Sequence, residues 1–160
     1  MRGYIYEITQ SRLDREDWAC ELDLESDNYP DYFRLLECDE DDDSERLEAI
    51  EHLKSEKWFD KVFEATDEPD VFVLKSVTPE LISRYHERIQ SEVQKLVESG
   101  KVDTFKLREA IDYPFGGNSR YLLSDWCGGV SEPTRELLEM LVNAEPGVKV
   151  YINSVFDYKW

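Results

Sequence analysis

The sequence predicts an α+β fold, with a small mixed or antiparallel sheet packed against several helices. Alternating β-branched and aromatic residues stand near both ends of the chain, in residues 3–9 and 147–156, and are typical of strands. Most of the chain between them carries apolar residues at helical spacing. Because no repeat or linker divides the 160 residues, we expect one domain, 1–160, whose first and last strands pair in one sheet.

The segment after the first strand is predicted to lie over the core in short helical turns near 14–20 and 30–37. Its apolar side chains stand singly among acids and would anchor it: Trp18, Leu22, Leu24, Tyr29, Tyr32, Phe33, Leu35 and Leu36. A regular helix follows, with apolar residues at helical spacing over 47–53. Asp42, with Glu45 three residues later, resembles a capping box at the start of that helix.

Local signals place the remaining elements. Thr78 and Pro79 are typical of a helix start, and an apolar stripe predicts that this helix, over 79–98, is the longest of the chain. In the last strand, Val148, Val150 and Ile152 should share the buried face, because side chains alternate along a strand. The other predicted elements are short helices over 57–65, 103–111 and 137–142, a buried strand over 70–77 and a short strand within 120–126.

Negative charge is the outstanding feature of the composition. The chain has 37 Asp and Glu against 19 Lys and Arg, a net charge of −18. Residues 14–45 hold fifteen acids and two arginines, a net charge of −13, which leaves −5 for the other 128 residues. This balance argues against direct binding to nucleic acid or to an anionic membrane. No apolar run approaches the roughly 20 residues of a membrane span.

The cysteines and the N-terminus predict a cytoplasmic protein. Cys20, Cys38 and Cys127 are odd in number and widely spaced, which is typical of reduced thiols rather than of a disulfide framework. The first residues lack the extended apolar stretch of a signal peptide. The oligomeric state stays open.

The sequence predicts neither a bound metal nor a cofactor. A calcium loop that begins at Asp39 would require glycine at its sixth position and glutamate at its twelfth, where the chain has Ser44 and Ile50. His86 begins half of a zinc-binding helix motif, but Gln90 stands where the second histidine is required. The glycine spacing of phosphate-binding loops is also absent.

Two stretches are weak candidate sites. Cys127 stands beside Gly128 and Gly129, whose N–H groups would stabilise an oxyanion, so it is a candidate nucleophile with His86 as its base. The alternative is a packed thiol beside a glycine turn. Asn118 and Arg120 follow a pair of glycines and mark a candidate ligand pocket, with a tight strand connection as the alternative.

The leading functional hypothesis is an acidic binding or inhibitory protein that engages a basic protein through residues 14–45. Carboxylates on a folded surface can imitate nucleic-acid phosphates or neutralise the basic site of a toxic enzyme. In size and charge the chain resembles phage or plasmid anti-restriction proteins and bacterial toxin-immunity proteins. The alternatives are a small enzyme centred on Cys127 and a domain whose acidity only serves solubility.

Seven residues are the predicted contacts with the partner. The five consecutive acids over 39–43 are expected to be exposed and mobile, because their neighbourhood has almost no cations. Aromatic residues among the acids would supply anchors within an acidic rim. The predicted contacts are Asp39, Asp41, Asp42, Asp43, Trp18, Tyr29 and Tyr32.

Overall fold

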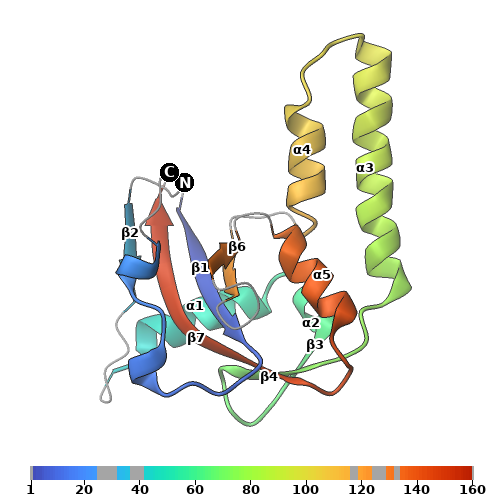
Figure 1. Ribbon diagram of the computed structural model, residues 1–160. Coiled ribbons are helices and arrows are strands. Elements are labelled where there is room, and N and C mark those ends of the chain that lie inside the picture. The colour runs from blue at the N-terminus through green and yellow to red at the C-terminus, as the bar shows by residue number, and fades with distance from the viewer. Residues whose placement is uncertain are drawn as a thin grey trace.

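A computed structural model describes residues 2–24, 32–36, 42–115, 119–123, 129–131 and 134–159. The fold is α+β, built on one mixed sheet (Figure 1). The strands run in the order β3-β4-β7-β1-β5-β6, and β2 also pairs with β7. Their bounds are Arg2–Thr9 (β1), Tyr32–Leu35 (β2), Phe63–Ala65 (β3), Val71–Leu74 (β4), Arg120–Leu123 (β5), Gly129–Ser131 (β6) and Lys149–Lys159 (β7).

The predicted pairing of the terminal strands is confirmed. β1 and β7 are antiparallel, with Arg2 opposite Lys159 and Thr9 opposite Tyr151. On its other edge the long β7 pairs first with β4 and then, nearer its end, with β2. Among the described pairs, β1 and β5 alone are parallel, which makes the sheet mixed.

A β-bulge interrupts the pairing of β1 with β7. Tyr6 lies opposite Val155, but Ile8 lies opposite Ile152. Between these two pairs β7 therefore contains one more residue than β1. The bulge shifts the alternation of side chains along β7. Val150 and Ile152 share the buried face as predicted, Val148 is half-buried before the strand begins, and Val155 joins the same face only after the shift.

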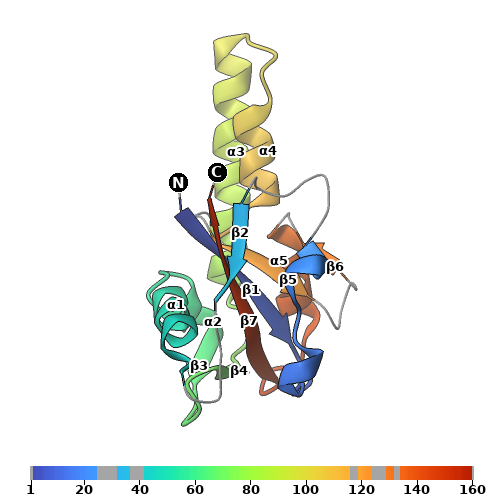
Figure 2. The same ribbon diagram turned by 90° about the vertical axis from the view of Figure 1, so that its left-hand side faces the viewer.

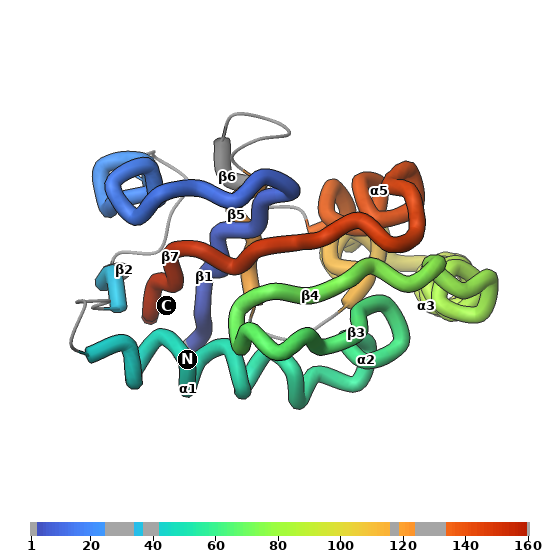
Figure 3. Tube along the Cα trace, turned by 90° about the horizontal axis from the view of Figure 1, so that it is seen from below, coloured from blue at the N-terminus to red at the C-terminus, as the bar shows by residue number. Residues whose placement is uncertain are grey.

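Both faces of the sheet are covered (Figure 3). The helices α1 (Ser44–Lys54), α2 (Phe59–Val62) and α5 (Arg135–Asn143) contribute to the larger apolar core, which includes Tyr6, Tyr121 and Val150 of the sheet. The short 3-10 helices η1 (Arg15–Asp17) and η2 (Glu21–Leu24) precede β2, and Ala19 and Leu24 pack in a smaller core on the opposite face. Residues 11–24 therefore belong to the body of the fold.

The helices α3 (Pro79–Ser99) and α4 (Phe105–Asp112) form a hairpin that stands away from the sheet (Figures 1 and 2). α3 is the longest described helix, as predicted, and ends at Gly100, whose φ of 63° is the left-handed conformation that favours glycine. No residue of α3 is fully buried. None of the helices in the described part of the chain is long and apolar enough to span a bilayer.

Two predicted helical stretches are wrong in part. The turns expected near 30–37 contain β2, because pairing with the end of β7 satisfies its backbone groups. The helix expected over 57–65 is helical only in α2, after which Phe63–Ala65 pairs with β4. The strand within 70–77, the helix over 103–111 and the helix near 137–142 are confirmed with shifted ends.

Candidate functional site

The acidic segment presents an exposed charged surface over η1, η2 and the start of α1. A contact of 3.8 Å between Arg15 and Asp43 links η1 to the start of α1, and a hydrogen bond from Leu35 N–H to Glu21 links η2 to β2. We call this region the acidic surface. Its exposed carboxylates belong to Asp14, Glu16, Asp17, Glu21, Asp23, Asp42 and Glu45. Leu22 lies among them with 72% of its area exposed.

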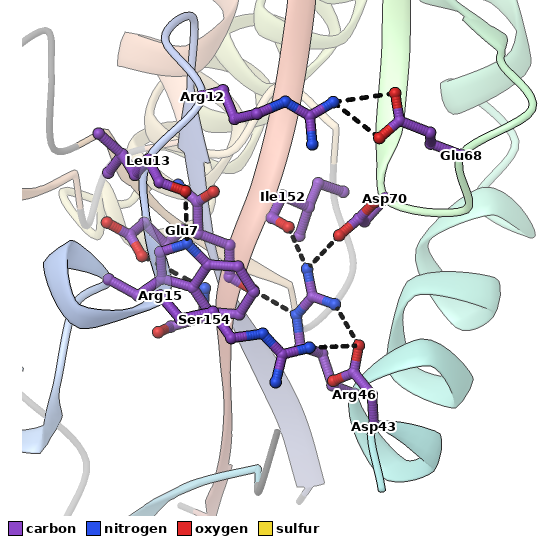
Figure 4. A network of polar contacts seen from close by, with 12 residues as sticks. Glu7, Arg12, Leu13, Arg15, Asp43, Arg46, Glu68, Asp70, Ile152 and Ser154 are labelled. Atoms are coloured by element: carbon purple, nitrogen blue, oxygen red, sulfur yellow. Dashed lines mark hydrogen bonds and ion pairs between the residues drawn. The ribbon is translucent and has the colours of Figure 1, made fainter. Parts of the chain in front are cut away.

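A buried arginine fixes the acidic surface to the sheet (Figure 4). The side chain of Arg46, from α1, is 1% exposed and forms ion pairs of 2.8 Å with Asp43 and 2.7 Å with Asp70. The same guanidinium donates hydrogen bonds to the carbonyls of Asn153, at 2.5 Å, and Ile152. Because a guanidinium carries five N–H donors in a planar fork, it can serve all four acceptors at once.

Two acceptors of Arg46, the carbonyls of Ile152 and Asn153, lie at the β-bulge. The irregular pairing near residues 152–154 requires partners for backbone groups that a regular ladder would satisfy. Glu7, the β1 residue at the bulge, is 1% exposed. It accepts hydrogen bonds from Ser154 N–H at 3.2 Å and from Ala19 N–H at 2.9 Å. A buried cation and a buried carboxylate thus stabilise the bulge from two sides.

Trp18 covers this polar centre. Its ring lies 4.6 Å from the Arg46 guanidinium and 5.4 Å from that of Arg15, and its indole N–H donates to the carbonyl of Leu13 at 3.3 Å. Cation–π contacts of this kind are favourable when the cation is desolvated. Trp18 is half-buried and packs within its own chain, while its predicted contact with a partner stays a prediction.

The two described acids of the 39–43 run differ. Asp42 is exposed, and hydrogen bonds from the Ser44 hydroxyl at 2.6 Å and the Ser44 N–H at 3.0 Å lower its pKa. Asp43 is half-buried and paired with Arg46, so the expectation of a run exposed throughout and almost without cations is wrong there.

The predicted capping box is also wrong. Asp43, not Asp42, is the N-cap of α1, and its side chain makes no capping hydrogen bond with the first turn of the helix. Glu45 pairs instead with Arg34 of β2 at 3.1 Å, because β2 lies beside the start of the helix. Three of the predicted contacts, Asp39, Asp41 and Tyr29, lie outside the described residues, and Tyr32 lies within β2.

A second feature lies beside α1 and α3. An open cavity of about 530 Å³ is bounded by the end of α1, the turn before α2, the first half of α3 and the residues that follow α4. Its aromatic lining comes from Trp58, Tyr85 and Phe115. The net charge of its lining is positive, opposite in sign to that of the whole chain. Glu56 is accompanied there by four cationic residues and a histidine: Lys57, Lys61, Arg84, Arg88 and His52.

Of the two residues predicted to mark a ligand pocket, Arg120 is described and Asn118 is not. Arg120 is half-buried, and its guanidinium lies 4.2 Å from the centre of the Tyr113 ring. It does not line the cavity, whereas Pro114 and Phe115 do. Asn118 lies outside the described residues. The cationic lining was not predicted from the sequence, although Lys57/Lys61 and Arg84/Arg88 each stand four residues apart, the spacing of one helix face.

The pairing of the proposed nucleophile, Cys127, with His86 stays a prediction. His86 is exposed on α3, with its ring 5.7 Å from that of Tyr85, and Cys127 lies outside the described residues. Within the described ranges, no group of three or more His, Cys, Asp or Glu side chains is arranged to hold a metal ion.

Comparison with protein-family models, with curated proteins and with solved structures finds no significant match to this chain. Its function is therefore inferred from its own residues.

Proposed function

We propose that this chain is a binding protein whose acidic surface engages a basic protein partner. The observation that carries the proposal is Leu22, which is 72% exposed on η2 between the exposed carboxylates of Glu21 and Asp23. An apolar residue in the centre of a charged rim is the arrangement found at protein–protein contacts, where a desolvated anchor is surrounded by polar groups.

The charges would act before contact. At physiological salt the potential of surface carboxylates extends about 8 Å, so a cluster of them attracts a basic partner and orients it. Arg46 is buried, and both of the carboxylates it pairs with, those of Asp43 and Asp70, lie outside the exposed acids around Leu22. It therefore holds the surface in place without neutralising the exposed acids around Leu22.

Rigidity also favours binding. Arg46, Glu7 and Trp18 tie η1 and the start of α1 to β7 through contacts of buried groups. A surface that is already ordered loses less conformational entropy on association. The acidic segment is thus a preformed surface over its described part, which distinguishes it from a tail that would fold only on binding.

The test removes charge without touching the supporting contacts. Asp14, Glu16 and Asp17 are exposed, and no ion pair among the described residues uses their carboxylates. In a triple variant, Asp14→Asn, Glu16→Gln and Asp17→Asn, we expect association with a basic protein captured from the native cell extract to slow about tenfold at low salt.

A matched control keeps the same change in net charge. Glu87, Glu92 and Glu98 lie on α3, away from the acidic surface, and their replacement by Gln should leave the association rate within about twofold. Leu22→Ser should speed dissociation, because it removes the apolar anchor. Equal capture by both triple variants, together with no effect of Leu22→Ser, would contradict the proposal.

A further inference from the structure

The cavity between α1 and α3 concentrates positive charge in a strongly acidic chain. Over the whole sequence, acids outnumber Lys and Arg by 37 to 19, but in the cavity lining Lys and Arg outnumber acids by four to one. Because like charges repel, four cations gathered around one hollow destabilise one another. An anion bound among them would offset this repulsion.

Two of these cations are available to a ligand. No ion pair or hydrogen bond within the described part of the chain involves the ammonium groups of Lys57 and Lys61. Arg84 forms an exposed ion pair of 2.8 Å with Glu80 one turn earlier. Arg88 donates one hydrogen bond of 2.9 Å to the carbonyl of Tyr113, which orients its guanidinium and leaves further N–H donors for a ligand.

The aromatic lining forms a firm wall of the cavity. Trp58 is 6% exposed and stacks on Phe115, with ring centres 4.1 Å apart and an angle of 21° between the planes. Tyr85 is half-buried and donates a hydrogen bond of 2.8 Å from its hydroxyl to the carbonyl of Ile111. The Trp58–Phe115 stack joins the turn before α2 to the segment after α4, and Tyr85 joins α3 to α4, so the cavity does not depend on a single element.

We propose that this cavity binds a small molecule that carries a phosphate group on a planar ring system, as nucleotides do. Lys57, Lys61 and Arg88 would contact the phosphate, since arginine and lysine are the usual protein ligands of phosphate oxygens. The ring system would pack against Phe115 and Tyr85, because aromatic side chains stack on planar ligands.

Size and charge favour a small molecule over a polyanion. A volume of about 530 Å³ lies within the usual range of roughly 300–1,000 Å³ for small-molecule sites. A nucleic-acid strand would bring many phosphates close to a chain of net charge −18, and most of them would lie outside the cationic hollow. A nucleotide brings one to three phosphates, which the four cations can compensate.

The experiment compares ligands that carry a phosphate group, a planar ring system or both. The four common nucleoside monophosphates, inorganic phosphate and uncharged adenosine are titrated into the full chain, with binding followed by calorimetry and by backbone amide resonances. We expect at least one monophosphate to bind with submillimolar affinity and at least tenfold more tightly than inorganic phosphate, and adenosine to bind no more tightly than phosphate. The shifted resonances should cluster in residues 52–61, 81–88 and 114–115.

Variants connect the binding to the cavity. Lys57→Gln with Lys61→Gln should weaken the binding at least tenfold, and because Lys57 is exposed and Lys61 half-exposed, the fold should be unaffected. The control, Lys101→Gln with Lys106→Gln, makes the same change in charge at the far end of the hairpin and should change the affinity less than twofold.

Three results would overturn the inference. They are no binding of any monophosphate at 5 mM, undiminished binding in the Lys57/Lys61 variant, and tighter binding of a short single-stranded oligonucleotide than of every monophosphate. The acidic-surface variants leave this cavity intact, so the failure of one proposal can be distinguished from the failure of the other.

Discussion

In the sheet, β1, β5 and β7 bury side chains on both of their faces, whereas α3 buries none of its 21 residues fully. The difference extends to charge, since residues 79–112 hold seven acids and six lysines or arginines, so the hairpin is close to neutral within a chain of −18. The sheet is held by burial and by a buried polar centre. The hairpin is held by half-buried contacts between two helices, and its tip exposes Val97, Val102 and Phe105.

The comparison shows which part of the chain supports the proposed sites. The acidic surface is fixed to the sheet through Arg46 of α1 and Glu7 of β1. The cavity depends on both regions, because one wall belongs to α1 and α2 and the other to α3. Destabilising substitutions in the sheet should therefore lower the free energy of global unfolding. Those in the hairpin should promote only local opening of the two helices.

The largest expected effect follows from removing Arg46. Arg46→Ala leaves Asp43, Asp70 and two strand carbonyls without their donor in a buried place, so we expect a loss of about 3–5 kcal/mol in the free energy of unfolding. Urea denaturation measures it. The control is Arg84→Ala in the hairpin, whose ion pair with Glu80 is exposed and should cost about 0.5 kcal/mol or less. Similar losses in the two variants would contradict the distinction between the regions.

Arg46 also shows where prediction from sequence ends. Periodicity located the helix that carries it, and the last strand, whose carbonyls it contacts, was predicted to pair with the first. The bulge in β7 was not predictable, because it depends on a pairing register between residues 144 or more positions apart. Without the bulge, neither the acceptors of Arg46 nor the role of Glu7 can be inferred. For this reason the cation that pairs with Asp43 was not expected from the sequence.

The acidic surface and the cavity also differ in how far each can be predicted from the sequence. Fifteen acids within residues 14–45 are visible in the sequence, and those that the structure describes there lie mostly at the surface, as their hydration requires. The cavity combines residues from 52–61, 81–88 and 114–115, which only the tertiary fold brings together. β2 was missed for the same reason, since its pairing with the end of β7 outweighs local propensity.

High pH should destabilise the sheet through two buried tyrosines. Burial raises the pKa of both Tyr6 and Tyr121 well above the ordinary value of about 10. Above that pH the unfolded chain releases these protons while the folded chain retains them, so stability is full below about pH 10 and falls above it, by about 1.4 kcal/mol per pH unit for each tyrosine. Urea denaturation between pH 9 and 11.5 measures this slope.

Tyr6→Phe serves as the control for the pH dependence. It should roughly halve the slope above pH 10, because one of the two groups no longer titrates. At neutral pH it should cost about 1 kcal/mol, because the Tyr6 hydroxyl donates a hydrogen bond of 2.9 Å to the carbonyl of Ala49. An unchanged slope in this variant would assign the alkaline loss to other groups.

In the hairpin, Tyr85→Phe should have a smaller and local effect. The variant removes the hydrogen bond of 2.8 Å from Tyr85 to the carbonyl of Ile111, which joins α3 to α4. We expect a loss of about 1 kcal/mol in the local opening free energy, or roughly fivefold faster amide hydrogen exchange. The faster exchange should be confined to residues 79–112. Equal acceleration in β1 and β7 would show that hairpin and sheet open together.

The smallest expected effect concerns the tip of the hairpin. Val102 is 97% exposed, so Val102→Ala removes no buried apolar area and should change the free energy of unfolding by less than about 0.5 kcal/mol. Val62→Ala makes the same chemical change at a site with 0% exposure and should cost about 2 kcal/mol, because it creates a cavity in the larger core. Measuring both variants at low and high protein concentration sharpens the comparison. If Val102→Ala destabilised the protein only at high concentration, the tip would be covered by a second copy, and the hairpin would owe its stability to association rather than to its own two helices.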